Sequence, residues 1–568
     1  MKEADFLTKT STFGPTLEDR EYTEDEKLVL KHFFTNIDKN IYAATDAMPN
    51  TLWALLEGGY SRSQLSMRMR FLDIFREMEK DLEKGKIAQE DVITIKQFAD
   101  NIRSGSTLDL SFFLSKAEKF MRKWAVQYGH SSLKDSDVVR FAIENITQYA
   151  TKRHVEEARL GAYQEKSTRY VPFSKDHLVI PTDLKQYACE IKEWNDFLYD
   201  CYESCMPAAA EFLKKKLDRS TFKTDAAFDR TVNAKVFDIV RYFLPSTLLT
   251  SIGVVWPTRE AERHISKLMS DPREEVRMIG QTLLEEGKKV SPGLLSHVNV
   301  NEYHRTRSND LLTMSNSAPL PQVEPLSGRM HDAVTLLEIT PEIETKMAAG
   351  MLYEHHLCNQ PYSKFLSVCR SNPALVSKTF STYLNNRGQF DEPHIAAEVG
   401  SILFEVTMDL GGYRDLQRHR RNLILPQPFS AVIGFEYPQY VEDEPELAEI
   451  KHKMDLCAHK TQELHEKIRR THPMHAEYVV MFSNKIRFLW QMDPRQLSYV
   501  VELRSTPAGH HSYRRIVQEM FKEVAPYMPN FARFIRVDMS GGDEGRKKQE
   551  ERTVEKLQQL GGDLMRKS

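Results

Sequence analysis

The sequence predicts a protein of the α/β or α+β class. Segments with helical periodicity dominate both halves of the 568-residue chain, and Ile516, Val517, Met520 and Val524 mark one such helix. A strand is predicted at residues 334–341, where the apolar run Val334-Thr335-Leu336-Leu337 ends at Pro341. Few clusters of turn residues separate the periodic segments. Alternation of this kind favours helices packed on sheets.

Three further helices are predicted from apolar spacing and from capping residues. One has Asp271 as its N-cap, Pro272 in the first turn, Glu274 and Glu275 at the positive dipole end, and Lys288-Lys289 at the other end. Another contains Val138, Ala142, Ile146 and Tyr149. The third is a stripe that Gly411-Gly412 interrupts, formed by Ile395, Val399, Ile402, Val406 and Leu410.

The chain divides at a segment rich in proline and serine. Residues 315–330 contain Pro319, Pro321 and Pro325 and read as an extended linker. We therefore predict an N-terminal domain at 1–314 with an N-terminal elaboration, a C-terminal domain at 331–540, and a charged tail at 541–568.

Composition narrows the class of function. With 41% hydrophobic and 28% charged residues the chain is typical of a soluble globular protein, and a net charge of −3 argues against nucleic acid as a partner. No stretch approaches the ~18 apolar residues of a membrane span. The first residues lack the apolar core of a signal peptide, so we expect a cytoplasmic protein.

The cysteines give no sign of a metal site. No CxxC pair occurs, and Cys201 and Cys205 lack a second ligand pair nearby, so we expect no metal and reduced thiols. The six cysteines are Cys189, Cys201, Cys205, Cys358, Cys369 and Cys457.

Two arginine-containing motifs are candidates for anion binding. Arg418-His419-Arg420 could bind an anion through bidentate guanidinium groups, and Ser167-Thr168-Arg169-Tyr170 could offer hydroxyl, backbone N–H and guanidinium donors to one phosphate. Taken alone, the first motif is more typical of a solvated basic patch at a helix end, and the second of a short turn.

The two motifs belong to longer series that run in the same order in each half. The first half has Tyr128-Gly129-His130-Ser131-Ser132, then Glu157-Ala158-Arg159, Ser167 to Arg169, an expected strand at Arg241-Tyr242-Phe243-Leu244-Pro245, Arg259, and Leu268. The second half has Arg418-His419-Arg420, Pro428 and Ser430, Glu477, Asp493-Pro494-Arg495, and Arg504. Arg241 and Arg259 are eighteen residues apart, as are Glu477 and Arg495.

This order resembles the flavin-dependent thymidylate synthases, the ThyX family, and does so twice. The resemblance implies an α+β fold with two tandem ThyX-like domains, each a mixed sheet packed with long helices, that form a pseudo-dimer. Sites in that family are shared between subunits. Each half here has lost residues that the other keeps, which implies one composite site between the halves and one abandoned site.

The resemblance implies FAD-dependent reductive methylation of dUMP to dTMP, with methylenetetrahydrofolate as carbon donor and NADPH as reductant. Arg504 would be the catalytic residue, polarising the uracil. The substrate-binding residues would be Ser167, Arg169, Arg241, Arg418 and Arg504. The FAD-binding residues would be Arg418, His419, Arg420, Arg495, His394, Glu398, His130, Ser132 and Arg259, with His394 and Glu398 four apart on one helix face.

Two alternatives stay open. The chain could alkylate another uracil nucleotide with the same flavin chemistry, since Pro428 and Ser430 alter half of the inherited loops. It could also be a non-catalytic nucleotide-binding or scaffolding homologue, which the lost residues would favour. In either case the family resemblance suggests self-association into a four-domain dimer.

Overall fold

The computed structural model describes residues 21–48, 63–84, 95–104, 138–169, 173–317 and 333–541, together with positions 547, 550–552 and 555. Most of the predicted linker and tail lies outside the described residues, as do His130, Ser132 and Tyr170. Across the described ranges, no helix has both the length and the apolar composition that crossing a bilayer requires.

Two four-stranded sheets organise the described chain, one in each half. The first has the order β1-β2-β4-β3 and the second β5-β6-β8-β7, and every described strand pair is antiparallel, so the prediction of mixed sheets is wrong. The strands are β1 (Ile41–Ala43), β2 (Val138–Thr147), β3 (Ala162–Glu165), β4 (Leu249–Pro257), β5 (Val334–Ile339), β6 (Ile402–Asp409), β7 (Leu423–Pro426) and β8 (Lys485–Met492).

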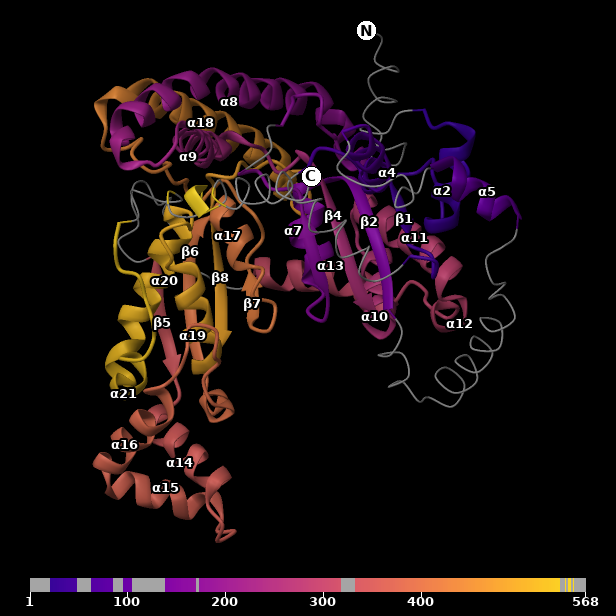
Figure 1. Ribbon diagram of the computed structural model, residues 1–568. Helices are drawn as coiled ribbons and strands as arrows, with labels where there is room; N and C mark the ends of the chain where they lie inside the picture. Colours follow the sequence, from indigo (N-terminus) through magenta and orange to yellow (C-terminus); the bar gives the residue numbers. More distant parts are fainter. Residues whose placement is uncertain are drawn as a thin grey trace.

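Helices follow equivalent strands in both halves. The equivalent pairs are α7 (Gln148–Arg153) and α17 (Leu410–Leu416), α8 (Ala188–Lys216) and α18 (Ala448–Arg469), α10 (Thr258–Met269) and α19 (Pro494–Arg504), and α11 (Glu274–Val290) and α20 (His511–Val524). The long α8 and α18 lie together across the top of the molecule, and the two sheets stand side by side beneath them (Figure 1). The common strand order and the common helix positions make the halves structural repeats.

The strand register fixes which residues are equivalent. Thr147 pairs with Leu249, and Asp409 pairs with Lys485; Thr147 and Asp409 also cap α7 and α17 in the same way. Counting from β4 and β8 makes Arg241 equivalent to Glu477, and Leu268 to Arg504, as predicted. Counting from the two caps places Glu156-Glu157-Ala158 opposite Arg418-His419-Arg420, one residue earlier than predicted.

The halves contact each other through equivalent segments. Pro245 and Met481, which are equivalent positions, face one another in an antiparallel bridge. Beside them Ser246 N–H donates to Val480 O (2.8 Å), and Phe482 N–H donates to Leu244 O (2.9 Å). In the upper layer Trp194 Nε1 of α8 donates to Thr461 Oγ1 of α18 (2.9 Å). One hydrophobic core runs through this interface into the second sheet.

The remaining helices elaborate the two repeats. In the second half α14, α15 and α16 form a lobe below the sheet, and α9 lies beside α8 and α18 (Figure 1). The other helices are α2 (Glu24–Phe33), α4 (Met67–Glu83), α5 (Ile95–Ser104), α9 (Asp225–Val240), α12 (Pro292–Leu295), α13 (Glu302–Ser317), α14 (Ile343–His355), α15 (Tyr362–Ser371), α16 (Pro373–Leu384) and α21 (Pro529–Ala532).

Two predicted helices are strands. Residues 138–147 form β2, and the stripe at 395–410 falls on a 3-10 turn, η8 (Ile395–Glu398), on β6, and on the start of α17. Nine of the ten β2 residues are buried or half-buried, so the strand shows no polar alternation, and apolar residues four apart fit a helix by coincidence. Gly411-Gly412 lies inside α17, where a Cβ on Gly412 would meet Met408 Cε and Ser512 Oγ at 2.7 Å.

The structure confirms two further predicted elements and corrects two others. The helix containing Ile516 and the strand beginning at Val334 are confirmed as α20 and β5. The predicted helix near Asp271 begins at Glu274, because Asp271 instead accepts from the Arg273 backbone N–H (2.9 Å). Arg241 lies in a 3-10 turn, η7 (Arg241–Phe243), rather than in a strand.

Candidate active site

Asp415 on α17 lies at the centre of an arginine cluster that both halves supply. Burial alone would raise the pKa of its carboxyl group, but four guanidinium groups lower that pKa to about 2. They belong to Arg241 and Arg169 of the first half and Arg418 and Arg504 of the second. The structure therefore brings together four of the five predicted substrate-binding residues, from positions more than 300 residues apart.

Arg241 is the most deeply buried member of the cluster. It ends α9, where η7 turns the chain, and its side chain is 1% exposed. Its Nη1 lies 3.8 Å from Asp415 Oδ2, while Nε and Nη2 are buried without a hydrogen-bond partner among the described residues. Buried guanidinium groups are almost always fully paired, because an unpaired buried charge is costly. The orphaned atoms indicate a place for an anion.

Arg169 is held in place from both sides of the interface. Its Nε and Nη2 donate to the two Asp238 carboxylate oxygens (2.6 and 3.0 Å), and its Nη1 lies 3.5 Å from the Tyr513 hydroxyl of the second half. Ser167, the fifth predicted substrate-binding residue, accepts from the Arg169 backbone N–H at its Oγ (3.3 Å). Ser167 therefore shapes the loop that carries Arg169.

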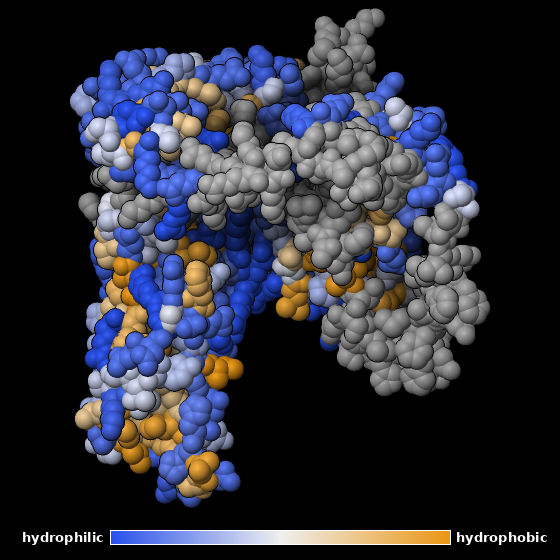
Figure 2. All heavy atoms as spheres, in the orientation of Figure 1, coloured by the Kyte–Doolittle hydropathy of each residue, from blue (hydrophilic) through white to orange (hydrophobic). Residues whose placement is uncertain are grey.

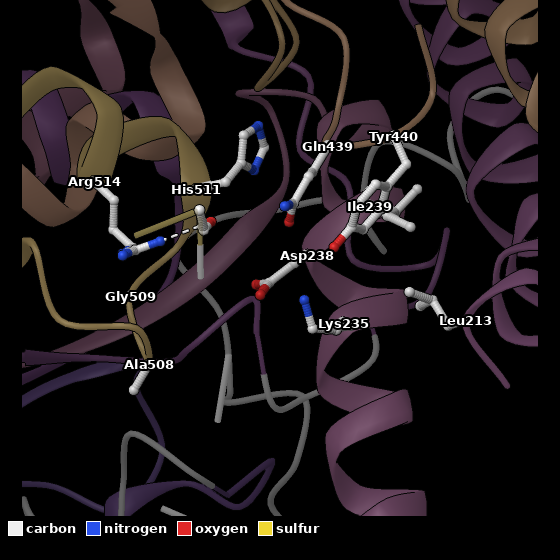
Figure 3. A pocket seen from close by; sticks show the side chains of 11 residues that line it. Leu213, Lys235, Asp238, Ile239, Gln439, Tyr440, Ala508, Gly509, His511 and Arg514 are labelled. Carbon is white, nitrogen blue, oxygen red and sulfur yellow. Dashed lines mark hydrogen bonds between the residues drawn. The ribbon is translucent and has the colours of Figure 1, made fainter. Parts of the chain in front are cut away.

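Asp238 also borders a small cavity behind the cluster. The cavity of about 20 Å³ has room for one water molecule. Figure 3 shows the Asp238 carboxylate facing it together with Lys235, while Arg514 donates to Gly541 O (2.9 Å) on the opposite wall. This cavity is too small for a nucleotide, so Asp238 acts here as a partner of Arg169.

His419 and Arg504 form a directional pair. Arg504 Nε donates to His419 Nε2 (2.8 Å), so the imidazole proton lies on Nδ1. Burial, together with Arg504 and Arg420, lowers the pKa of His419 to about 3, and the ring is therefore neutral. The Tyr499 ring packs edge-on against His419 at 5.7 Å.

Four residues of this site were not found from the sequence: Asp415, Asp238, Tyr513 and Glu165. Glu165 at the end of β3 accepts from Arg414 Nη2 (2.8 Å) and pairs with Lys152 Nζ (2.6 Å). Burial would raise its pKa, but Arg414 and Lys152 lower it to about 2. Nothing in the local sequence marks these residues, because their partners lie far away along the chain.

The residues predicted to bind FAD lie in several places. Arg495 Nη1 donates to Glu398 Oε1 (2.7 Å), and Arg421 also pairs with Glu398. His394 instead caps η8 by accepting from Ala396 N–H at Nδ1 (3.0 Å). His394 and Glu398 therefore do not share a helix face, and that prediction is wrong. Arg259 is the second residue of α10, while Arg420 lies 4.1 Å above the Tyr163 ring.

A cleft of about 610 Å³ lies along α19, beside the arginine cluster. Tyr499, Leu503 and Phe390 supply apolar surface, and Arg495, whose Nε is buried without a described partner, supplies charge. A cavity of this size with apolar walls and a few convergent polar groups is typical of cofactor sites. The cleft adjoins the arginine cluster through α19, whose last residues are Leu503 and Arg504.

Glu354, His355 and His394 bring three potential metal-ligating atoms within 4.8 Å of one another. However, His394 Nδ1 accepts from a backbone N–H, so in the neutral ring Nε2 carries the proton, which Glu354 Oε2 accepts at 2.9 Å. The Nε2 lone pair that a metal would need is therefore absent in this arrangement. We interpret the group as a hydrogen-bonded cap.

The equivalent cluster in the other composite position is filled by a carboxylate. Glu477, at the position equivalent to Arg241, pairs with Arg273 Nη2 (2.8 Å) and with Arg153 Nε (3.5 Å). It also accepts from Phe429 N–H (2.9 Å). Arg153 is equivalent to Asp415, so the charges of the Arg241–Asp415 pair are exchanged here. Asp271 balances Arg273 (3.0 Å), which leaves this second cluster without a net charge.

The repeated fold and the arginine cluster to which both halves contribute define a protein built from two like regions with a shared candidate anion site. The sequence model of the thymidylate synthase complementing protein family matches residues 86–293 and 335–530. The chain belongs to this family, as a tandem ThyX-like protein.

Relatives fall into two groups. The UPF0159 protein of Chlamydia muridarum is 28% identical over 552 residues, which cover 94% of this chain and 98% of the relative. The UPF0159 protein of Chlamydia pneumoniae is 27% identical over 562 residues, with the same shares covered. The flavin-dependent thymidylate synthase of Saccharolobus solfataricus is 26% identical over 180 residues, or 31% of this chain and 60% of that protein.

Proposed function

We propose that this chain is a flavin-dependent thymidylate synthase with one composite site, which converts dUMP to dTMP with FAD, methylenetetrahydrofolate and NADPH. The observation that carries the proposal is the buried Arg241 guanidinium, whose Nε and Nη2 have no described partner although three more arginines surround the same carboxylate. Family membership supplies the reaction class.

The charge of the arginine cluster fits a nucleotide 5′-phosphate. Arg169, Arg241, Arg418 and Arg504 face two carboxylates, Asp415 and Asp238, which leaves an excess of two positive charges. A phosphate monoester carries a charge between about −1.5 and −2 at pH 7. Arg241 and Arg169 would bind the phosphate through charge-assisted hydrogen bonds, and Ser167 would fix the loop that carries Arg169.

Arg504 would polarise the uracil. Its Nε is already engaged by His419, so its two Nη groups are the donors left to face a substrate carbonyl as negative charge develops there. The His419 ring, held by Tyr499 and kept neutral by burial, would fix the direction of Arg504. Arg418, which is exposed and interacts electrostatically with Asp415, would also reach the nucleotide.

The cleft along α19 would hold the flavin. Tyr499 and Leu503 offer flat apolar contact for a ring system, and Arg495 offers a buried donor. A bound FAD supplies hydride chemistry that no side chain can provide. Placing the cleft and the arginine cluster on two faces of α19 would bring cofactor and nucleotide to one helix. Arg420 and His419 would contribute between them.

The two halves would act as a pseudo-dimer, with the second composite position closed by Glu477. The bridge between the equivalent residues Pro245 and Met481 supports this arrangement. We further propose that two chains associate into a four-domain dimer in the cytoplasm. Sedimentation at micromolar concentration tests this association.

The first experiment is an absorbance spectrum of the purified chain under anaerobic conditions. We expect flavin bands that bleach with NADPH and shift when dUMP is added. A protein that is colourless and takes up no added FAD would instead be a non-catalytic nucleotide-binding homologue. Bleaching by NADPH together with a spectral shift only for another uracil nucleotide would assign a different substrate.

Two substitutions test the composite site. Arg169→Ala in the first half and Arg504→Ala in the second should each abolish dTMP formation while the fold is kept. The exposed Arg230→Ala on α9 is the control and should be active. If only one of the two site substitutions matters, the site is not shared between the halves.

A further inference from the structure

A second cavity, of about 650 Å³, lies in the first half at the position equivalent to the cleft along α19. Its walls come from α10, from the loop Glu157–Leu160, from His304 of α13, and from Arg420-Arg421 of the second half. Glu260 lines this cavity and its equivalent Gln496 lines the α19 cleft; Arg159 and Arg421 correspond in the same way. The two cavities are therefore repeats of one feature.

The lining of the two cavities differs in chemistry. Where α19 presents Tyr499 and Leu503 to its cleft, α10 presents Arg263 and Lys267 at the equivalent positions. The flat apolar contact that a ring system needs is thus replaced by two cations one helical turn apart. Figure 2 shows predominantly hydrophilic surface in the recess between the two halves.

Cations from three other places reach the same cavity. Arg159 donates through Nε and Nη2 to the backbone carbonyls of Arg420 (3.3 Å) and Arg421 (3.0 Å), and no carboxylate among the described residues forms an ion pair with it. The Arg420 Nε atom is buried without a described hydrogen-bond partner, and so is His304 Nδ1. These orphaned atoms are independent of the cavity's size and charge, and both lie on residues that line it.

Carboxylates also face the cavity but do not cancel its charge. Five cationic side chains line it against two acidic ones, Glu157 and Glu260, which is an excess of three. Lys267 pairs with Glu157, and Arg263 lies 3.8 Å from Glu260. Outside the lining, Glu156 lies 3.8 Å from Arg420, and Glu398 pairs with Arg421. A positive excess remains, centred on Arg159.

We infer that this cavity, bounded by α10, Arg159, Arg420 and His304, binds a ligand with two or more adjacent phosphate groups. Arg263 and Lys267 lie about 6 Å apart along the helix axis, further than one phosphate group bridges in bidentate fashion. The planar guanidinium group of arginine matches the geometry of phosphate oxygens and can bind two of them at once. Such a site is separate from the dUMP cluster, because Arg241 and Asp415 do not line it.

The test is calorimetric titration of the full chain with inorganic tripolyphosphate. We expect Arg263→Ser combined with Lys267→Ser to remove one binding event or to raise its Kd at least tenfold, whereas Arg241→Met in the composite cluster leaves that event unchanged. Both α10 side chains are solvent-accessible, 74% and 32% exposed, and a thermal melt checks that the fold is retained. Loss of binding in the Arg241 variant, in both variants, or in neither overturns the inference.

A parallel titration with ATP distinguishes a nucleotide from a free polyphosphate. Binding more than tenfold tighter than tripolyphosphate would show that the nucleoside also contacts the cavity. Equal affinity would assign the phosphate chain alone. Because dUMP is titrated separately, failure of this inference leaves the proposed synthase function untouched.

Discussion

Arg504 Nε donates a hydrogen bond to His419 Nε2 at 2.8 Å, so one arginine is directed by a neutral histidine. The bond ties the Arg-His-Arg triplet after α17 to the last residue of α19, eighty-five positions further along the chain. The remaining Arg504 donors are thereby aimed without any charge being neutralised. In the proposed function these remaining donors would face the substrate.

Replacing His419 should therefore lower turnover more than binding. We expect His419→Leu to reduce kcat about 10- to 100-fold, as loss of a supporting hydrogen bond commonly does, with little change in the Kd for dUMP. His419→Gln, whose amide oxygen can accept from Arg504, should restore part of the rate. Single-turnover flavin oxidation measures the step directly. Equal losses in the two variants would contradict a directing role.

Arg241→Met should weaken substrate binding yet stabilise the fold. Removing one charge-assisted partner of the phosphate should raise the Kd for dUMP roughly 10- to 100-fold. Removing a buried guanidinium with two orphaned nitrogens should raise the free energy of unfolding by about 1 kcal/mol or more. Urea unfolding and dUMP titration measure the two effects, with the exposed Arg230→Met as control. A destabilised variant would show that Arg241 is structural.

Glu477→Gln should destabilise the fold and leave substrate binding unchanged, the opposite of what we expect for Arg241→Met. Arg273 and Arg153 would lose the carboxylate that both contact, and breaking such a buried pair costs about 3–5 kcal/mol of unfolding free energy. The Kd for dUMP should not change, because Glu477 lies outside the working cluster. The exposed Glu463→Gln on α18 is the matched control. Weaker dUMP binding in the Glu477 variant would mean that both clusters serve the substrate.

Stability should fall in mild acid because of buried neutral histidines. Burial lowers the pKa of His264 to about 4, against about 6.5 in an unfolded chain. Between pH 6.5 and pH 4 the His264 imidazole binds a proton in the unfolded state but not in the folded state. The unfolding free energy therefore decreases from pH 6.5 down to pH 4 and levels off below pH 4. One such group contributes about 3 kcal/mol across that window.

Urea unfolding at pH 7 and pH 4.5 measures this loss. His264→Gln should lose less stability over the interval than the parent chain, since its side chain does not titrate. The exposed His459→Gln should behave like the parent chain. An unchanged loss in the His264 variant would show that other groups dominate the acid response.

The sequence predicted well those elements whose pattern matches one burial geometry. The α20 helix has one apolar face, and β5 ends at Ile339, two residues before Pro341. The β2 and β6 strands were missed because both of their faces are covered, so apolar spacing carries no period. The spacing of apolar residues depends on which faces of an element are exposed to solvent, as well as on its secondary structure.

The arginine cluster was predictable only in part. Family resemblance marked Arg241 and Arg504, but nothing local marked Asp415, Asp238 or Tyr513. Arg169 and Tyr513 are 344 residues apart, and Glu165 and Arg414 are 249 apart, so their meeting depends on how the repeats face one another. A contact between two segments that are far apart in the sequence produces no recognisable residue spacing within either segment.

The exchange of charge between Arg241–Asp415 and Glu477–Arg153 has a genetic consequence. In an assembly of identical subunits one gene encodes every copy, so each substitution enters all sites together. A glutamate at the position of Arg241 would then enter every site of the assembly at once. Once two copies are joined in one reading frame, they mutate separately. One can keep the chemistry while the other becomes a scaffold that natural selection shapes for rigidity.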